Sequence, residues 1–285
     1  MDGASTEAIP PEDAFALLGH DIRISIVQAL WELDNEPASF SELRDTAAIT
    51  DSGQFNYHLG ELRGVFVRET EDGYALNYAG RSVVGAILDG TYTKQRRVPE
   101  YGAGFRCAVC DTELTASYSD SAFRITCTEC DYLISRVDLP PGAVDDRDES
   151  ALVSTASYWI QAKFFLITNG VCPNCAGPME HSWRTDVAYE NHEFVLQADC
   201  ADCINTATAT GIWAYANHPA VVSFFYDHDI NLHENWWHSQ LLIGGGAARI
   251  RSRDPWRGAV SYAVDGEVLA LVVDESGQVV AGERR

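Results

Sequence analysis

Hydrophobic and polar positions between residues 39 and 62 follow the period of two short helices. Ser39 and Glu42 have the spacing of a capping box, and Asp51 with Gln54 repeats that pattern after Ile49-Thr50. In the second segment, apolar residues recur at i, i+4 and i+7, at Phe55, Leu59 and Leu62. The pattern predicts two helices in tandem, the second with one buried face and one outer face.

The outer face of the second helix is polar, and two short apolar segments follow it. This face carries Ser52, Gln54, Asn56, Tyr57 and Glu61. Residues 65–67 and 74–76 are predicted strands, joined through Glu71-Asp72-Gly73 as a hairpin turn. Two short helices and a hairpin form a winged helix-turn-helix, which places its second helix in the DNA major groove. A small helical domain without a ligand is the alternative that the pattern leaves open.

Three more helices are predicted around this segment. Residues 1–10 form a flexible leader, and Pro11 begins a helix with an apolar side at Phe15, Leu17 and Leu18. Asp21 is the predicted cap of the next helix, whose core positions are Ile22, Ile26, Leu30 and Leu33, with His20 and Trp31 as packing residues. A helix over 79–95 has a stripe at Val83, Val84, Ile87 and Leu88. This stripe either forms a dimer interface or closes the core.

The cysteines give the strongest chemical signal. All eight lie in Cys-x-x-Cys pairs after a predicted linker at 99–104, and the pairs form two sets: Cys107, Cys110, Cys127 and Cys130, then Cys172, Cys175, Cys200 and Cys203. Two such turns facing each other form a tetrahedral four-sulfur zinc site. Disulfides are disfavoured because the chain lacks a secretion signal, and a redox dithiol is disfavoured because four pairs share one spacing.

Alternating segments between the cysteine pairs predict two zinc ribbons, at about 105–138 and 170–216, which resemble an internal duplication. Each ribbon is followed by a β-like tail and a helix. The tails are 132–134 and 212–215, and the helices are about 150–168 and 219–227. The apolar side of the first helix is predicted at Tyr158, Trp159, Ala162 and Phe165. Val221, Val222, Phe224 and Phe225 line the second.

The last part of the chain predicts a small antiparallel sheet over 247–280, broken at Asp265-Gly266 and at 275–277. Three histidines precede it at five-residue spacing: His228, His233 and His238. This spacing does not place three imidazoles on one helical face, so we expect packed or hydrogen-bonded histidines, with a third metal site as the alternative. Gly244-Gly245-Gly246 lacks the Lys-Ser/Thr of a P-loop and is predicted to be a turn.

Composition limits the partners. The net charge is −22, and Lys94 and Lys163 are the two lysines among 20 basic residues. This acid excess resembles proteins of salt-loving archaea, in which concentrated salt shortens the Debye length to about 3 Å or less. DNA binding there depends on local contacts rather than on a basic patch, while solubility alone also explains the charge. The N-terminus has no signal peptide and no apolar run spans a bilayer, so we expect a cytoplasmic protein.

Several runs resemble arsenic-repressor (ArsR)-type winged-helix regulators. They are Leu18 to Val27, Phe40-Ser41-Glu42-Leu43, Tyr57-His58-Leu59-x-x-Leu62 and Phe66-Val67. Asp51 to Leu59 resembles the recognition-helix signature of the haloarchaeal branch. The resemblance covers about the first third of the chain and implies a dimer that reads palindromic double-stranded DNA. The family's inducer-binding cysteines are not expected, because residues 40–48 contain no cysteine.

These inferences predict an α+β protein: a winged helix-turn-helix domain at 11–98 and a domain at 105–285 with two four-cysteine zinc ribbons, helices and a small antiparallel sheet. The expected base-reading residues are Ser52, Gln54, Asn56 and Tyr57, and the expected phosphate contacts are Arg63 and Arg68, with Arg96 and Arg97. Four-cysteine sites leave no open coordination position, and no catalytic motif is present, so we expect no enzyme.

The leading hypothesis is therefore a DNA-binding transcriptional regulator, a homodimer whose zinc-containing C-terminal domain senses a ligand or mediates assembly. The alternative is a general transcription-machinery or protein-interaction factor, in which the winged helix and ribbons dock on proteins. A third hypothesis is a small-molecule pocket in the C-terminal domain, lined by Trp159, Trp213, Trp236, Trp237 and Trp256, although aromatic richness is more often core.

Overall fold

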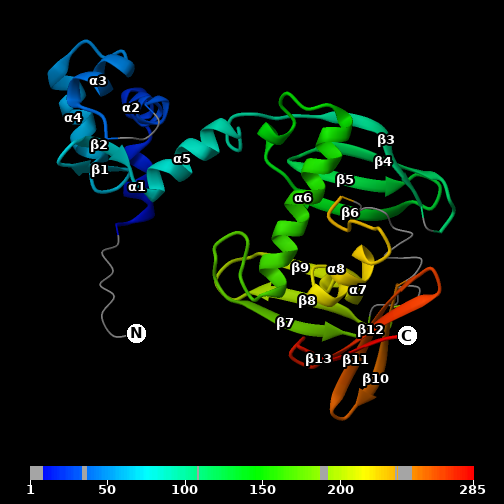
Figure 1. Cartoon of the computed structure of the whole chain (residues 1–285). Helices are drawn as coiled ribbons and strands as arrows, with labels where there is room; N and C mark the ends of the chain where they lie inside the picture. The colour runs from blue at the N-terminus through cyan, green and yellow to red at the C-terminus, as the bar shows by residue number, and fades with distance from the viewer. Residues whose placement is uncertain (1–8, 34–36, 108, 187–191, 235, 237–245) are drawn as a thin grey trace. The chain divides into compact units, whose positions relative to one another are not determined.

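The chain divides into two compact units, Met1–Lys94 and Gln95–Arg285. The structure is a computed structural model that describes residues 9–33, 37–107, 109–186, 192–234, 236 and 246–285 (Figure 1). It has helices and several small antiparallel sheets, so the α+β class is confirmed. Among the described residues, no helix combines the length and the apolar character needed to cross a bilayer.

The first unit contains five helices in its described residues and a two-stranded hairpin. The helices are α1 (Pro11–Leu17), α2 (Asp21–Glu32), α3 (Phe40–Thr46), α4 (Ser52–Leu62) and α5 (Tyr78–Leu88), and the strands are β1 (Val67–Thr70) and β2 (Gly73–Leu76). One hydrophobic core joins α2, α3, α4 and the hairpin, with Ile26, Leu30, Leu43, Phe55, Leu59, Leu62 and Leu76 among its buried members. The predicted apolar stripe of α4 is therefore the buried one.

Side-chain caps fix the beginnings of α3 and α4. The Glu42 amide donates to Ser39 Oγ at 3.3 Å, and the Ser39 amide donates to Glu42 Oε2 at 3.0 Å. The Asp51 carboxylate accepts from the amides of Gly53 and Gln54 at 2.8 and 2.9 Å. Such caps satisfy amides that have no partner inside the helix, so the sequence determines where each helix begins.

The hairpin begins two residues later than predicted, because Val65 and Phe66 precede the strand and the Phe66 amide still bonds to the Leu62 carbonyl at 3.0 Å. Its turn follows the prediction. Gly73 has a φ of 137°, and a Cβ there would lie 2.2 Å from the Ala38 carbonyl oxygen. Ala38 and Tyr74 exchange backbone hydrogen bonds of 2.9 Å in both directions, and this pairing requires the close approach.

Four predicted details of the first unit are wrong. His20 is the N-cap of α2, and its Nδ1 accepts from the Ile22 amide, whereas Asp21 is the first helical residue. Phe15 and Trp31 are exposed rather than packed, at 72% and 45%. Helix α5 ends at Leu88, before Gly90 with its φ of 72°, rather than near residue 95. Helical period alone did not distinguish these surface aromatics from core residues.

The described residues of the second unit form three antiparallel sheets. The first has the order β3-β4-β5-β6 and the second β7-β8-β9, and the third is the meander β10-β11-β12-β13. Their strands are β3 (Val98–Arg106), β4 (Glu113–Ser119), β5 (Ala122–Cys127), β6 (Tyr132–Asp138), β7 (Met179–Arg184), β8 (Val195–Cys200), β9 (Thr206–Thr210), β10 (Gly246–Arg253), β11 (Trp256–Val264), β12 (Glu267–Asp274) and β13 (Val279–Arg284). The predicted C-terminal sheet is confirmed. Its predicted turn is confirmed as well, and both turn residues, Asp265 and Gly266, have a positive φ.

The predicted linker at 99–104 is wrong, because these residues lie in β3. Tyr101 pairs with Ala116 and Gly102 with Thr115 across the ladder to β4. Gly102 also approaches the Glu113 side chain so closely that a Cβ would lie 2.5 Å from Oε1. The proline and glycines that suggested a linker therefore belong to an irregular edge strand, which is where prolines and bulges occur in sheets. The division between the units falls between Lys94 and Gln95.

Helix α6 (Glu149–Thr168) extends from the first sheet to the second (Figure 1). Leu152, Val153, Ala156 and Ile160 pack into the core of the first sheet, and Ile167 packs beside Cys172 and Met179. The predicted apolar face was wrong: Tyr158, Trp159 and Phe165 are 54%, 42% and 56% exposed. The helix is apolar on both sides, so its period alone did not determine which side is buried. The exposed side is called the α6 aromatic face below.

The described part of the second unit also has three short helices: the 3₁₀ helix η1 (Pro141–Ala143), α7 (Gly211–Ala214) and α8 (Pro219–Tyr226). Residues 212–215 were predicted to be β-like, but they lie largely in α7. Their apolar run fits a buried helical turn against the C-terminal sheet equally well, with Ile212 buried beside Val260 and Tyr262. The predicted α8 is confirmed, and Val221, Phe224 and Phe225 are buried in the same core.

Candidate functional site

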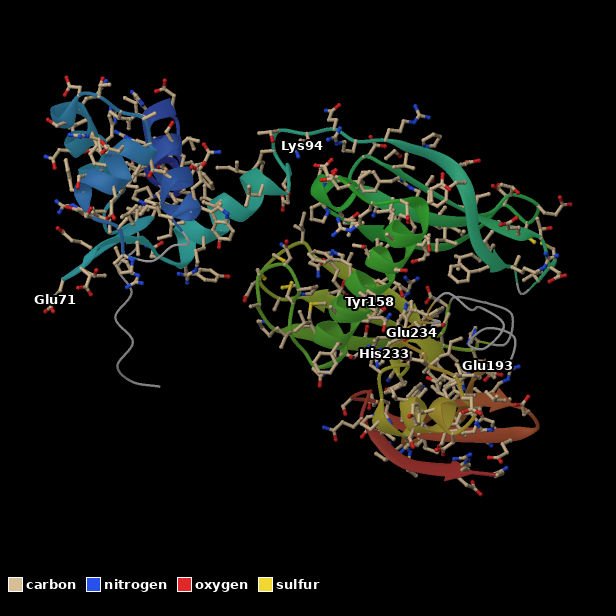
Figure 2. The ribbon with its side chains drawn as sticks, turned by 45° about the horizontal axis from the view of Figure 1, so that its top comes forward. Glu71, Lys94, Tyr158, Glu193, His233 and Glu234 are labelled. Carbon is tan, nitrogen blue, oxygen red and sulfur yellow. The ribbon has the colours of Figure 1, made fainter. Side chains whose placement is uncertain are left out.

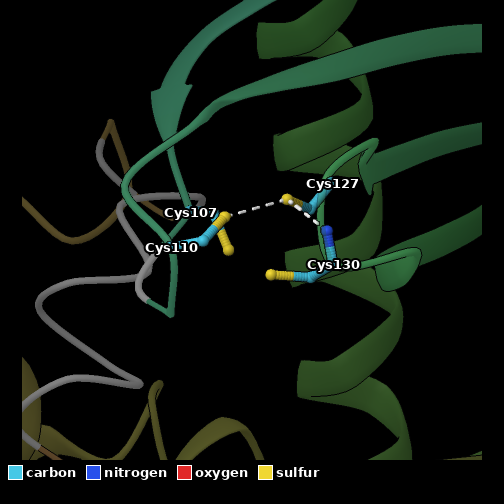
Figure 3. A group of neighbouring side chains, drawn as sticks. All are labelled: Cys107, Cys110, Cys127 and Cys130. Carbon is cyan, nitrogen blue, oxygen red and sulfur yellow. Dashed lines mark hydrogen bonds between the residues drawn. The ribbon is translucent and has the colours of Figure 1, made fainter.

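The first four-cysteine group is assembled by the ends of three strands. Cys107 follows β3, Cys110 lies in the next turn, Cys127 ends β5, and Cys130 precedes β6. The four sulfur atoms lie within 4.8 Å of one another, with Cys110 Sγ and Cys127 Sγ 3.4 Å apart (Figure 3). The Cys107 amide bonds to the Thr112 carbonyl at 2.8 Å, which closes the first turn and directs both of its sulfurs inward.

The second group repeats this arrangement. Cys172 and Cys175 precede β7, Cys200 ends β8, and Cys203 precedes β9. Its sulfur atoms also lie within 4.8 Å, with Cys172–Cys203 at 3.7 Å and Cys175–Cys200 at 3.5 Å. The closing bonds recur as well, from the Cys172 amide to Gly177 and from the Cys200 amide to Asn205. The predicted grouping of the eight cysteines is therefore confirmed.

These sulfur separations fit a tetrahedral metal site. At a metal–sulfur distance of about 2.3 Å, the sulfurs of a regular tetrahedron lie about 3.8 Å apart. A disulfide would require about 2.05 Å, which no sulfur pair approaches. Both groups could hold a metal ion with four sulfur ligands, and such a site has no open position for water or substrate.

Without metal, the thiols within each cysteine group differ in pKa. Hydrogen bonding from Thr112 lowers the pKa of Cys110 to about 6, and Cys130, which donates to Cys110, has its pKa raised to about 12. In the second group burial opposes ionisation of Cys172, but hydrogen bonds from the amides of Cys175 and Asn174 lower its pKa to about 6. A cation that binds four thiolates must displace the remaining protons, so metal affinity falls as the pH falls.

The outer face of α4 carries the predicted base-reading residues together. Ser52, Gln54, Asn56 and Tyr57 are all exposed, Tyr57 at 60%. Within the described residues, none of these four side chains makes a hydrogen bond. Their donors and acceptors are therefore available to an external partner. This face is called the α4 polar face below.

His58 anchors α4, which the sequence did not predict. Its side chain is buried, and its Nδ1 accepts from Arg23 Nε at 3.2 Å. Arg23 of α2 also pairs with Glu61 at 3.1 Å. The Glu61 carboxylate is therefore engaged by Arg23 and does not belong to the α4 polar face. Burial, followed by the nearby His20 and Arg23, lowers the pKa of His58 and keeps it neutral as an acceptor. His58 lies three residues after Phe55, a helical spacing that could have marked it as buried.

The predicted phosphate contacts have different surroundings. Arg63 pairs with Glu69 at 2.6 Å, whereas Arg68 is exposed and has no ion pair among the described residues. Both arginines line a shallow hollow between the end of α4 and β1, beside Gly60, Gly64 and Asn77. Arg96 lies in the second unit, within which it pairs with Asp145 at 2.6 Å. The tip of the hairpin is acidic, with Glu71 at its outer end (Figure 2) and Asp72 beside it.

Two of the three histidines after α8, His228 and His233, are hydrogen-bonded, as predicted. His228 Nδ1 lies 2.8 Å from the Phe224 carbonyl oxygen, and His233 Nδ1 lies 2.7 Å from Gln161 Oε1 of α6. His238 and the residues Gly244 and Gly245 of the predicted turn lie outside the described residues. Of the tryptophans predicted to line a pocket, Trp236 is buried beside Trp213, Trp256 stacks on Trp183 at 5.6 Å, and Trp159 is 42% exposed. Trp237 lies outside the described residues.

A buried histidine that the sequence did not single out is expected to make the second unit sensitive to acid. His192 is 5% exposed, and its Nδ1 has no hydrogen-bond partner in the described chain. Burial, followed by the charge of Arg249, lowers its pKa from 6.5 to about 4. The unfolded chain therefore takes up this proton more readily, and stability is lost between about pH 6.5 and pH 4, by about 3 kcal/mol in all.

The variant His192→Leu should flatten this part of the pH dependence. We expect urea unfolding of the second unit to show a smaller loss of stability between pH 7 and pH 4.5 in the variant than in the unaltered chain. The matched control is His233→Leu, because His233 has a hydrogen-bond partner. Parallel stability curves for His192→Leu and the unaltered chain would contradict the assignment to His192.

Comparison with known proteins gives two family matches. A family described as Domain of unknown function (DUF7351) matches residues 104–279, and another described as Domain of unknown function (DUF7347) matches residues 11–87. No curated protein and no solved structure matches the chain. The two matches lie in the two compact units, one in each.

Proposed function

The chain belongs to the DUF7351 family, whose description names no function, and we propose that it is a DNA-binding transcriptional regulator. In this proposal, α3, α4 and the β1–β2 hairpin act as a winged helix-turn-helix of the ArsR type, and α4 enters the major groove of operator DNA. Two chains bind as a homodimer to a palindromic site. The second unit mediates assembly or senses a ligand.

The α4 polar face is the observation that carries the proposal. Asn and Gln side chains can bond to adenine through both of its major-groove atoms, and Ser and Tyr can reach bases or phosphates. The side chains of Gln54 and Asn56 are exposed and make no hydrogen bond within the described chain. Two independent anchors hold the helix that presents them: the Asp51 cap and the Arg23–His58 bond. A rigid helix with unengaged polar groups favours recognition of a fixed pattern of donors and acceptors.

Charge indicates how this interface would hold DNA. Arg63 already pairs with Glu69, and the hairpin tip carries Glu71 and Asp72, so Arg68 is the clearest candidate for a phosphate contact. Few phosphate contacts release few counterions, and such binding depends only weakly on salt concentration. This agrees with the net charge of −22, because concentrated salt would screen the long-range repulsion of DNA.

In the second unit we propose Zn²⁺ in both four-cysteine groups. Four thiolates in a tetrahedron are the ligand set of structural zinc, and a closed site supports folding rather than catalysis. The ions would cross-link the turns at the ends of the first and second sheets. In this proposal neither zinc ion is catalytic, and zinc would maintain the surface that the second unit offers to a partner.

The alternative is a protein-interaction or transcription-machinery factor. The acidic hairpin tip and the α6 aromatic face favour it, because carboxylates repel phosphates and exposed aromatic residues are enriched at protein interfaces. In that case the first unit would dock on a protein partner through the same α4 polar face.

Selection of binding sites from random duplex DNA, performed with the metal-loaded full chain in molar KCl, distinguishes the two functions. The regulator is expected to enrich one palindromic sequence, because two copies of α4 would read two half-sites. The retained DNA should bind again in competition with a scrambled duplex of equal length. A selection that enriches no sequence, together with purification of the native chain in complex with polymerase subunits, would establish the alternative instead.

A further inference from the structure

Two asparagines divide the second cysteine group into protected and unprotected sulfurs. The Asn174 amide donates to Cys172 Sγ at 3.4 Å, and its side-chain Nδ2 donates to Cys203 Sγ at 3.7 Å. Asn205 does the reverse, with its amide 3.4 Å from Cys203 Sγ and its Nδ2 3.5 Å from Cys172 Sγ. Each asparagine therefore bridges the same two sulfurs, and we call this arrangement the asparagine clasp.

The other two sulfurs lie outside the clasp. The amide of Asp202 donates to Cys200 Sγ at 3.4 Å and the amide of Gly177 donates to Cys175, but no side-chain amide among the described residues reaches Cys175 or Cys200. Cys175 is also the one cysteine of the eight that is exposed. Hydrogen bonds to a thiolate reduce the electron density that it can offer to an electrophile, and exposure admits the reagent. In the metal-bound group, where all four sulfurs are thiolates, Cys175 is therefore the most reactive sulfur, and Cys200 lies 3.5 Å from it.

The first group lacks this asymmetry. Cys107 and Cys127 are buried, and Cys110 and Cys130 are partly buried. Its sulfurs belong to the main core of the second unit, beside Leu114, Phe123 and α6. The second group rests on a much smaller cluster, formed with Ile167, Met179 and Ala198. An oxidant from solvent thus meets the second group first.

We propose that the second group is a redox-sensitive metal site, at which a hydroperoxide modifies Cys175 and links it to Cys200 in a disulfide. The asparagine clasp keeps Cys172 and Cys203 as thiolates while this occurs. The cation then has two sulfur ligands instead of four, and it leaves the second ribbon. The first group retains its ion, so the response is confined to β7–β9 and the end of α6.

The two steps balance with hydroperoxide as the oxidant. The Cys175 thiolate attacks the distal oxygen, the O–O bond breaks, and the remaining oxygen leaves as an alcohol or water after it takes a proton from solvent. The Cys200 thiolate then attacks the sulfenic sulfur of Cys175, so that the S–S bond forms and the S–O bond breaks. The departing hydroxide takes a proton and becomes water. The sulfur pair loses two electrons, and the peroxide gains them.

A carboxylate beside the site favours a neutral oxidant. Asp202 closely approaches Gly177, two residues after Cys175. At this short range a carboxylate disfavours an anionic oxidant, whereas hydrogen peroxide and alkyl hydroperoxides are uncharged at neutral pH. The class of reagent that this site accepts is therefore a small neutral hydroperoxide.

The test uses the full chain loaded with two equivalents of zinc, verified by elemental analysis, and treated with increasing hydrogen peroxide. A chromogenic chelator measures released zinc, and peptide mass spectrometry locates disulfides. We expect release of one equivalent before the other, together with a Cys175–Cys200 linkage. The proposal is overturned if the chain binds fewer than two ions, if both ions leave together, or if the first disulfide joins any other pair.

The double variant Asn174→Ala and Asn205→Ala tests the clasp itself. We expect the second ion to leave about tenfold faster, as for other losses of outer-shell partners, and Cys172–Cys203 disulfide to appear beside Cys175–Cys200. The matched control is Asn169→Ala, whose side chain bonds to the Phe165 carbonyl and not to a sulfur. An unchanged rate and an unchanged disulfide map in the double variant would remove the asparagines from the proposal.

Discussion

The triple variant Gln54→Ala, Asn56→Ala and Tyr57→Ala is expected to lose about 100-fold or more of its affinity for the selected DNA site. Each bidentate contact to a base contributes about 1–3 kcal/mol of discrimination, and the variant removes two side chains able to form one. Because all three side chains are exposed, the fold should be retained. Fluorescence anisotropy with the selected duplex measures the affinity, and thermal unfolding verifies the fold.

A matched surface variant controls for loss of exposed side chains in general. Glu12, Asp13 and Tyr92 are also exposed residues of the first unit and lie outside α4. Their replacement by alanine should leave DNA affinity within about threefold, since surface changes away from an interface have small effects. If both triple variants bind DNA as the unaltered chain does, α4 is not the recognition helix. If a protein partner is lost instead, α4 is a protein-binding helix.

Removal of metal is expected to have the largest effect on stability, and only in the second unit. Binding of four thiolates to structural zinc contributes about 10–16 kcal/mol in small peptides, which exceeds the stability of most domains. Even a loss of about 5 kcal/mol would lower the melting temperature of a unit of this size by about 10–20 °C. A strong chelator should therefore unfold much of Gln95–Arg285. The first unit contains no cysteine and should melt unchanged.

Single ligand variants should separate the two groups. Cys172→Ser is expected to remove hydrogen-exchange protection from β7–β9, because the small cluster around Ile167 and Met179 offers little apolar burial in place of the ion. Cys107→Ser should act on β3–β6, where Phe123, Tyr118 and α6 supply a larger core, so more protection should remain. Protection of α2 and α4 is the internal control. If a variant lost protection equally in both units, or if neither variant lost any protection, the cysteine groups would not support local folding.

The elements predicted correctly are those whose signal is local. The capping residues Ser39 and Asp51 each satisfy amides within three residues, so α3 and α4 begin where the sequence indicates. Cys-x-x-Cys spacing and the Asp265-Gly266 turn are local in the same sense. These features did not depend on knowing which other parts of the chain lie near.

The errors share a different cause. Helix α6 is apolar on two sides, and its burial was decided by which side the β3–β6 sheet covers. The glycine- and proline-containing segment 99–104 became a strand because β4 lay within reach of it. Neither result can be read from the segment alone, because burial and strand pairing depend also on the part of the chain that packs against it.

For the candidate sites, the sequence by itself determined the composition: eight cysteines in two sets of four, and a helix whose outer face bears Ser52, Gln54, Asn56 and Tyr57. Tertiary structure alone decided the hydrogen bond between Arg23 and His58 and the burial of His192. It also decided the asparagine clasp, in which the Asn174 side chain bonds to Cys203 and the Asn205 side chain to Cys172. The physical reason is that residue spacing specifies local turns and faces. Hydrogen bonds between distant residues depend on how packing brings those residues together.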